Sequence, residues 1–93
     1  MIVIVKSAPD TPDGQRGLKL ARDTAADLIL LQDSVFFVQG QRLEDFRGKI
    51  YVVDEDLKLR GLNDSRIRND FEIINYDIAV DLMTESNKVV GMF

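Results

Sequence analysis

The chain contains no cysteine and no histidine among its 93 residues. Without cysteine it can form no disulfide, hold no metal through thiolates and use no cysteine nucleophile. Without histidine it lacks the side chain that most often moves protons near neutral pH. Any chemistry of its own would have to use carboxylates, lysine, tyrosine, serine or threonine. We therefore expect no catalytic residue, and no bound metal or cofactor.

Long apolar runs and an excess of positive charge are missing as well. No apolar stretch approaches the ~20 residues that span a bilayer, and the first residues enter a strand pattern without a basic leader. We therefore expect a cytoplasmic protein that does not contact a membrane. The net charge of −4 argues against direct binding of nucleic acid, because phosphate contacts need clustered lysine and arginine.

What the chain does have is the composition of an ordinary soluble protein, with 45% hydrophobic and 30% charged residues. Its length fits one domain over residues 1–93. A chain of this size buries roughly 60–65% of the surface that its unfolded form exposes, which allows one core but no deep private active-site cavity. Many such domains complete their burial or their function by assembling with other chains, so we expect an oligomer.

Strand patterns alternate with helix patterns along the chain. Continuous apolar runs predict buried strands over residues 2–5, 28–31 and 50–53, the first of them central in the sheet, and residues 71–75 predict a fourth strand. Helical spacing predicts helices over residues 15–26, with Asp13 as a candidate cap, and over 34–38, 55–60 and 77–85. The two prolines within residues 6–14 predict a loop without regular helix, and residues 89–93 fit either an edge strand or a docked tail. The alternation predicts an α/β fold with a mostly parallel sheet of four or five strands.

Two of the predicted strands end in polar residues. The second strand runs into Gln32 and Asp33, and the third runs into three consecutive acids, Asp54, Glu55 and Asp56. The carboxyl ends of parallel strands meet at the edge of the sheet where ligands and partners bind. We therefore expect these five side chains to lie along one functional edge.

The acidic triplet permits two interpretations. Three adjacent carboxylates could bind Mg²⁺ through their oxygens. Acids at a helix start also satisfy free amide donors and complement the positive end of the helix dipole. Arg60 lies near the carboxyl end of the same predicted helix, where a positive charge is favourable. The second interpretation is the better supported, and it adds Arg60 to the candidates at the edge.

Adjacent large apolar residues mark a candidate oligomer interface. Phe36 and Phe37 stand side by side, so both rings fit one small core only at a helix corner. Aromatic residues are enriched at interface cores, and we predict that one of the two rings faces a partner, with burial of both as the alternative. Met92 and Phe93 are the other candidates, because an apolar terminus usually frays unless it docks.

Three segments carry a family resemblance: the apolar run 28–35 with Gln32-Asp33, residues 51–62 with a helix start followed by Arg60-Gly61, and residues 73–77. Taken together they resemble the DsrH/TusB family, the small subunits of the DsrE/F/H sulfur-relay proteins. The likeness covers nearly the whole chain. Its most specific parts are the Gln-Asp strand end and the Asp-Glu-Asp-Leu helix start at this spacing.

The resemblance implies a three-layer α/β/α sandwich that assembles with DsrE/TusD-like and DsrF/TusC-like sister subunits. In that family the complex passes persulfide sulfur onward, toward 2-thiolation of the wobble uridine of certain tRNAs or within dissimilatory sulfur oxidation. The active cysteine belongs chiefly to the DsrE-like chain. Some DsrH chains carry a cysteine of their own in the region that reads Ser7 to Gly17 here, and this sequence has none.

The resemblance therefore favours a non-catalytic subunit of a sulfur-relay complex. It implies that the edge residues orient a partner and its thiolate rather than make bonds. An alternative is a stand-alone homo-oligomeric DsrE/F/H-like protein with a binding or regulatory role. A third possibility, a carboxylate-based Mg²⁺ enzyme, would require the acidic triplet to bind metal.

Overall fold

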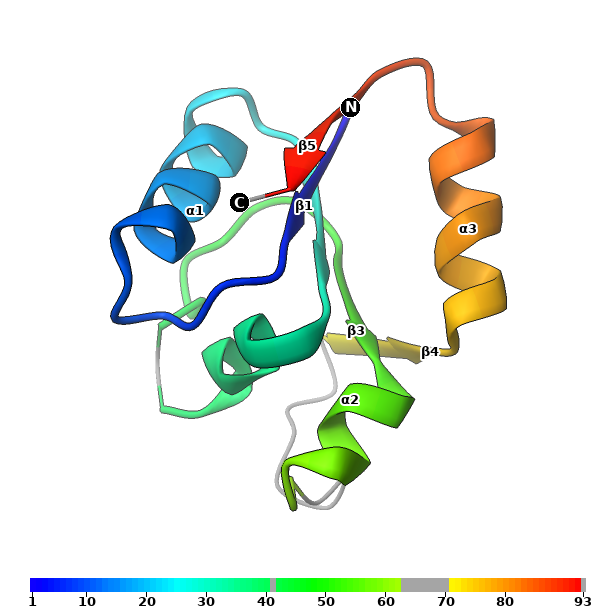
Figure 1. The fold of residues 1–93 in the computed structure, drawn as a ribbon. Helices are drawn as coiled ribbons and strands as arrows, with labels where there is room; N and C mark the ends of the chain where they lie inside the picture. The colour runs from blue at the N-terminus through cyan, green and yellow to red at the C-terminus, as the bar shows by residue number, and fades with distance from the viewer. Residues whose placement is uncertain (41, 63–70, 93) are drawn as a thin grey trace.

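The computed structural model describes residues 1–40, 42–62 and 71–92 (Figure 1). In this part of the chain five strands form one sheet, and every neighbouring pair of strands is parallel. The strands are β1 (Ile2–Val5), β2 (Asp27–Leu30), β3 (Ile50–Val53), β4 (Phe71–Ile74) and β5 (Val89–Met92). Their order across the sheet is β4-β3-β2-β1-β5. The predicted parallel α/β sheet is confirmed.

The middle of the sheet is occupied by β2, so the prediction of a central first strand is wrong. The strand β5 pairs with the outer side of β1, with Val89 opposite Ile2 and Val90 opposite Val3. An unbroken apolar run marks a strand that is covered on both faces, and every interior strand meets that condition. The same pairing shows that residues 89–92 form an edge strand rather than a docked tail.

Helices lie on both faces of the sheet, which confirms the three layers. They are α1 (Pro12–Asp23), the 3-10 helix η1 (Gln32–Val38), α2 (Asp54–Leu59) and α3 (Tyr76–Glu85). In Figure 1, α1 and η1 stand on one side of the strands, and α3 is the helix that the described residues place on the other side. The side chains of α1, η1 and α2 bury one face of the sheet, and Ala79, Leu82 and Met83 of α3 pack on the opposite face.

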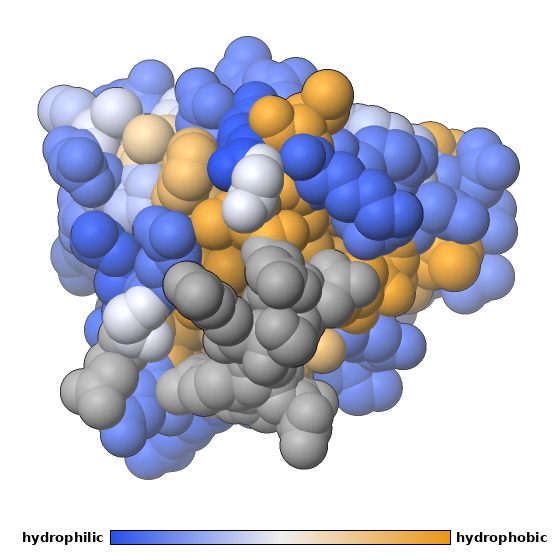
Figure 2. Space-filling view, turned by 90° about the horizontal axis from the view of Figure 1, so that it is seen from below, coloured by the Kyte–Doolittle hydropathy of each residue, from blue (hydrophilic) through white to orange (hydrophobic). Residues whose placement is uncertain are grey.

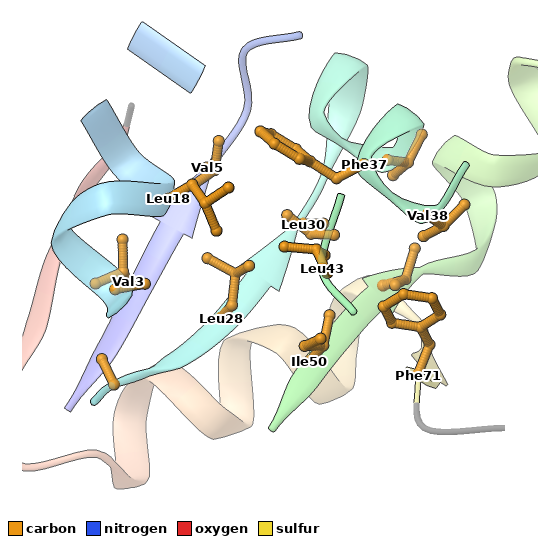
Figure 3. Close-up of a cluster of buried hydrophobic side chains, with 14 of the residues drawn as sticks. Val3, Val5, Leu18, Leu28, Leu30, Phe37, Val38, Leu43, Ile50 and Phe71 are labelled. Carbon is orange, nitrogen blue, oxygen red and sulfur yellow. The ribbon is translucent and has the colours of Figure 1, made fainter. Parts of the chain in front are cut away.

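The larger of the two apolar clusters fills the space between the sheet and the helices of the first face. Figure 3 shows its labelled members, among them Val3 and Leu28 from the strands and Leu18 from α1. The strand residues lie on the same face of the sheet, because residues two apart on a strand share one face. Leu18 packs against that face from the helix. The cluster fixes β1 and β2 against α1, and so fixes where the carboxyl ends of these strands lie.

The helix α1 begins three residues earlier than predicted. Thr11 is its N-cap, and the Thr11 hydroxyl accepts the backbone N–H of Gly14 at 3.1 Å. Pro12 is then the first helical residue, a position where its missing N–H costs no hydrogen bond, so the prolines do not exclude a helix here. Asp13 lies inside the first turn and is not the cap. A Cβ on Gly14 would lie 2.2 Å from the carbonyl oxygen of Ala8, so this turn requires glycine.

None of the helices in the described ranges is long and apolar enough to cross a bilayer.

Candidate functional site at the carboxyl edge of the sheet

Asp56 is the centre of the carboxyl edge. It lies in the first turn of α2, directly after β3, and only 3% of its surface is exposed. Its Oδ2 atom accepts the backbone N–H of Gln32 at 2.7 Å and the hydroxyl proton of Tyr76. Its Oδ1 atom lies 3.5 Å from Nη1 of Arg60. A buried carboxylate is costly unless it is paired and hydrogen-bonded, and these three partners meet that need.

The bond from Gln32 joins the end of β2 to the end of β3. Gln32 has a positive φ of 53°, in the left-handed region that non-glycine residues seldom adopt. Next to it, the Ser34 Oγ atom accepts the backbone N–H of Leu31 at 2.9 Å and lies 2.5 Å from the carbonyl oxygen of Val5. The strained turn after β2 is therefore held from both sides, by Asp56 and by Ser34.

Arg60 links the buried carboxylate to the surface. Its Nη2 and Nε atoms lie 3.0 Å and 3.1 Å from Oδ1 of Asp33, and its Nη1 atom faces Asp56. The Arg60 side chain is 21% exposed and Asp33 is 62% exposed. The planar guanidinium can satisfy two carboxylates at once, which a lysine ammonium does less well. Arg60 thus fixes the direction in which Asp33 points at the edge.

Tyr76 completes the network from the start of α3. The pKa of Tyr76 is raised to about 12, chiefly because its hydroxyl donates to Asp56, and further because of burial and the negative charges of Asp56 and Glu55. The positive charge of Arg60 acts in the opposite direction. The Tyr76 hydroxyl therefore stays protonated at neutral pH and acts as a hydrogen-bond donor.

The other two acids of the triplet do not join Asp56 around a common centre. Glu55 accepts the backbone N–H of Tyr76 at 3.4 Å, and Asp54 pairs with Lys58 at 3.0 Å on the surface of α2. No side chain of the triplet caps α2, whose N-cap is Val53. Within the described ranges no three acidic residues stand close enough to hold a metal ion. All three acids do lie in the first turn of α2, where negative charge complements the helix dipole as predicted, although none of their side chains caps the helix.

The six edge candidates from the sequence, Gln32, Asp33, Asp54, Glu55, Asp56 and Arg60, all lie in the segments that follow β2 and β3. Tyr76 and Ser34 are not among the candidates. Tyr76 is the first residue of the helix after β4, as Asp54 is the first residue of the helix after β3. The cap residue Asn75 accepts the N–H of Ile78 at 2.8 Å. The strand-end rule, applied to the fourth strand, would have found Tyr76. Ser34 gave no signal, because its contact with Val5 joins positions 29 residues apart in the sequence.

The predicted interface residues differ in their surroundings. Phe37 is 1% exposed and belongs to the larger apolar cluster, so this ring offers no surface to a partner. Phe36 is only partly buried and remains a candidate. The backbone of Met92 ends β5, while Phe93 lies outside the described residues. The adjacent pair is split between core and surface because the tight turn of η1 sends consecutive side chains in different directions.

The contacts of the edge fix the positions of its side chains and of the strand ends that carry them. The polar atoms of Asp56 are taken up by Gln32, Tyr76 and Arg60, and a protonated phenol is no nucleophile at neutral pH. In Figure 2, which looks at the carboxyl ends of the strands, hydrophilic surface lies around the outside of this face and apolar surface of the described residues is visible inside it.

The fold and this edge define a small α/β protein whose five-stranded parallel sheet presents a rigid polar network at its carboxyl ends. A family model described as DsrH like protein matches the chain over residues 6–89. The protein therefore belongs to the DsrH-like family. Among curated proteins, a sequence comparison finds no significant match.

The chain is similar to solved structures that include the following two. The crystal structure of the YchN protein from E. coli has a TM-score of 0.82 and 18% sequence identity, covering 99% of this chain and 97% of that one. The solution structure of protein Tm0979 from Thermotoga maritima has a TM-score of 0.64 and 26% identity, covering 97% of this chain and 98% of that one. The likeness to YchN supports the fold alone.

Proposed function

We propose that this chain is a non-catalytic, cysteine-free subunit of a sulfur-relay complex, serving 2-thiolation of the tRNA wobble uridine or related sulfur trafficking. The observation that carries the proposal is the DsrH family match over residues 6–89 in a chain without cysteine. Persulfide transfer needs a thiolate. Sulfur must then pass through a cysteine of another subunit, and this chain acts by shaping and positioning.

The carboxyl edge is the surface through which that positioning acts. Asp56 and Arg60 hold the turn after β2, so that Gln32 and Asp33 reach the surface in one arrangement. A preformed surface loses less entropy on binding than a mobile one. Exposed Leu59 and the half-exposed ring of Tyr76 add apolar area nearby.

The expected partners are DsrE/TusD-like and DsrF/TusC-like sister chains in a cytoplasmic hetero-oligomer, in which residues 1–93 act as one domain. Phe36, Met92 and Phe93 stay proposed contacts of that assembly. Direct contact with nucleic acid or a membrane is not part of the role. The net charge of −4 supports this, since it disfavours approach to phosphate groups.

The alternative is a stand-alone homo-oligomer of the DsrE/F/H type with a binding or regulatory role. A self-complementary surface could build a homo-oligomer from the same apolar area. A neighbouring gene for a similar small chain with a cysteine would favour the relay subunit.

Native mass spectrometry of the chain, alone and mixed with the products of its adjacent genes, tests the proposal. A defined hetero-complex that contains a cysteine-bearing chain is expected. A stable homo-oligomer that ignores those products would replace the relay subunit with the stand-alone protein. Addition of Mg²⁺ during the same experiment checks the carboxylate enzyme, which requires saturable metal binding.

A further inference from the structure

A hollow lies at the amino ends of β2 and β3, at the opposite end of these strands from the carboxyl edge. Its volume is about 250 Å³, slightly below the roughly 300–1,000 Å³ of pockets that hold drug-sized ligands. Ala21, Arg22 and Ala25 at the end of α1 form one wall, and residues 45–48, just before β3, form the other. The hollow therefore has room for a small organic molecule.

The two walls of the hollow are fixed against each other. The Nη2 atom of Arg22 donates to Oδ1 of Asp45 and to the carbonyl oxygen of Arg42, each at 3.0 Å. A Cβ on Gly48 would lie 2.3 Å from the carbonyl oxygen of Ala26, so only glycine lets this segment approach the end of α1 so closely. The shape of the hollow therefore depends on contacts within the chain, and the hollow is preformed.

The charged groups around the hollow leave one positive charge in excess, because two arginines, Arg22 and Arg47, line it with one acid, Asp45. Both hydrogen bonds of the Arg22 side chain come from Nη2, which leaves its Nε and Nη1 donors without a partner among the described residues. Arg47 is exposed, and it forms no hydrogen bond or ion pair with any residue that the structure describes. Two guanidiniums with free donors favour an anion, and their planar fork matches a carboxylate.

Apolar groups line the rest of the hollow. Ala21 is fully buried, and the ring of Phe46 is partly buried against the larger apolar cluster. Ala25 has a positive φ of 53° and ends α1 in a Schellman pattern, in which the N–H of Ala26 donates to the carbonyl oxygen of Ala21 at 3.0 Å. Glycine is the usual residue at this position, because a Cβ is strained there. The methyl group of Ala25 instead lines the hollow, where it offers a ligand an apolar contact that glycine lacks.

A second hollow that Arg22 also lines does not share these properties. Its volume is about 150 Å³, and its other charged residues are Lys19 and Asp23. These two pair with each other at 2.7 Å, so their charges cancel. The excess positive charge and the larger volume thus single out the hollow between α1 and residues 45–48.

We propose that this hollow binds a small organic monoanion, whose carboxylate lies on the guanidiniums of Arg22 and Arg47 and whose flat apolar body lies against Ala25 and Phe46. One negative charge matches the one positive charge in excess, whereas a dianion would also be repelled by Asp45. The inference goes beyond the proposed function and does not depend on it, because the hollow and the carboxyl edge lie at opposite ends of the strands.

Benzoate is the probe, because it joins one carboxylate to one flat apolar ring. The isotope-labelled full chain is titrated with benzoate, and amide shifts are followed by NMR. Saturable shifts are expected at Ala21, Ala25, Phe46 and Arg47, with a Kd on the order of millimolar for so small a ligand. Acetate keeps the carboxylate without the ring, and benzamide keeps the ring without the charge. Each of these two should bind at least about 5-fold more weakly than benzoate.

Four variants separate the parts of the site. Arg47→Gln should weaken benzoate binding about 5-fold or more, and Arg47→Lys, which keeps the charge but not the fork, about twofold to threefold. Lys49→Gln removes the same charge from an exposed residue outside the hollow, and it should change the affinity by less than about twofold, because solvent and salt screen it. Ala25→Gly should weaken binding about 3-fold through the lost methyl contact, although glycine suits the backbone there.

Thermal unfolding of each variant beside its titration separates lost binding from lost folding, and none of the four should unfold at a clearly lower temperature. Shifts that scatter over the surface or do not saturate would overturn the proposal. Equal affinity of the wild type and Arg47→Gln would overturn it too, since the carboxylate would then not lie on Arg47. Acetate that binds as tightly as benzoate would show that the hollow recognises charge alone, and the proposed class of ligand would be wrong.

Discussion

The hydroxyl of Tyr76 and the backbone N–H of Gln32 donate to the same oxygen, Oδ2 of Asp56. Tyr76 follows β4, Gln32 follows β2, and Asp56 follows β3. One carboxylate oxygen therefore joins the ends of three parallel strands. The geometry of this edge of the sheet therefore depends on a single buried acid.

Replacing Asp56 should destabilise the protein far more than replacing the neighbouring acid. Asp56→Ala leaves the Gln32 N–H and the Tyr76 hydroxyl without their acceptor, and we expect a loss of about 2–4 kcal/mol in the free energy of unfolding. Asp56→Asn keeps an acceptor but not the charge, so its loss should be about 1 kcal/mol. Asp54→Asn is the matched control, because its partner Lys58 is exposed, and it should change stability by no more than about 0.5 kcal/mol. Urea unfolding measures all three, and equal losses at the two positions would contradict the network.

Tyr76 should make stability depend on pH in alkaline solution. In the folded state the pKa of Tyr76 is about 12, against an ordinary value of 10.0. Between pH 10 and 12 the folded state holds the phenol proton and the unfolded chain releases it, so unfolding becomes easier as pH rises. Below pH 10 the contribution is fully present. Absorbance titration of the wild type and of Tyr76→Phe isolates this group, and urea unfolding across the same range should show a smaller decline for Tyr76→Phe. A Tyr76 that titrates near 10 in the folded protein would refute the bond to Asp56.

The positive φ of Gln32 gives a test of backbone strain with a built-in control. Ala25, at the end of α1, has the same φ of 53°. Glycine adopts this conformation freely but orders at a higher entropy cost, so Gln32→Gly and Ala25→Gly should each change stability by less than about 1 kcal/mol, toward greater stability. Thermal unfolding measures both. If Gln32 also contacts a sister chain, only Gln32→Gly should weaken the hetero-complex, and equal effects on assembly would remove Gln32 from the binding surface.

The sheet could be predicted from sequence because its information is local. The runs at residues 2–5 and 50–53 match β1 and β3 residue for residue, since fully buried parallel strands have continuous apolar sequence. The order of the strands is not local. Val89 and Val90 pair with β1 across the whole length of the chain, and nothing in residues 2–5 indicates whether a further strand lies beside them.

The sequence could predict where the edge residues lie, but not which of them bond to one another. The predicted strand ends showed where Gln32, Asp33 and Asp56 would lie, because parallel strands all finish on one side of the sheet. The spacing of the acidic triplet could not tell that only Asp56 turns inward. That choice is made by partners from distant elements, above all Tyr76, 20 residues further along the chain. Burial of Phe37 rather than Phe36 likewise depends on the turn of η1.

Arg60→Lys should separate the two tasks of Arg60, which are neutralising Asp56 and orienting Asp33. The ammonium keeps the charge but cannot place donors on both carboxylates, so we expect a loss of about 0.5–1.5 kcal/mol in stability. Arg22→Lys is a matched control at another site, because Arg22 also makes two contacts, with Asp45 and with the carbonyl oxygen of Arg42, each at 3.0 Å. Arg22 is more exposed, so its substitution should cost less than about 0.5 kcal/mol.

Assembly supplies the second readout for Arg60→Lys. If Arg60 fixes Asp33 for a sister chain, the affinity of the hetero-complex should fall about 5-fold or more in Arg60→Lys, as expected for the loss of one oriented, charge-assisted contact. The affinity of Arg22→Lys should stay at the wild-type value. Titration calorimetry with the sister chain measures both variants. A loss of stability in Arg60→Lys with unchanged affinity would mean that Arg60 serves the fold alone, and the binding role of the carboxyl edge would then rest on the residues around it.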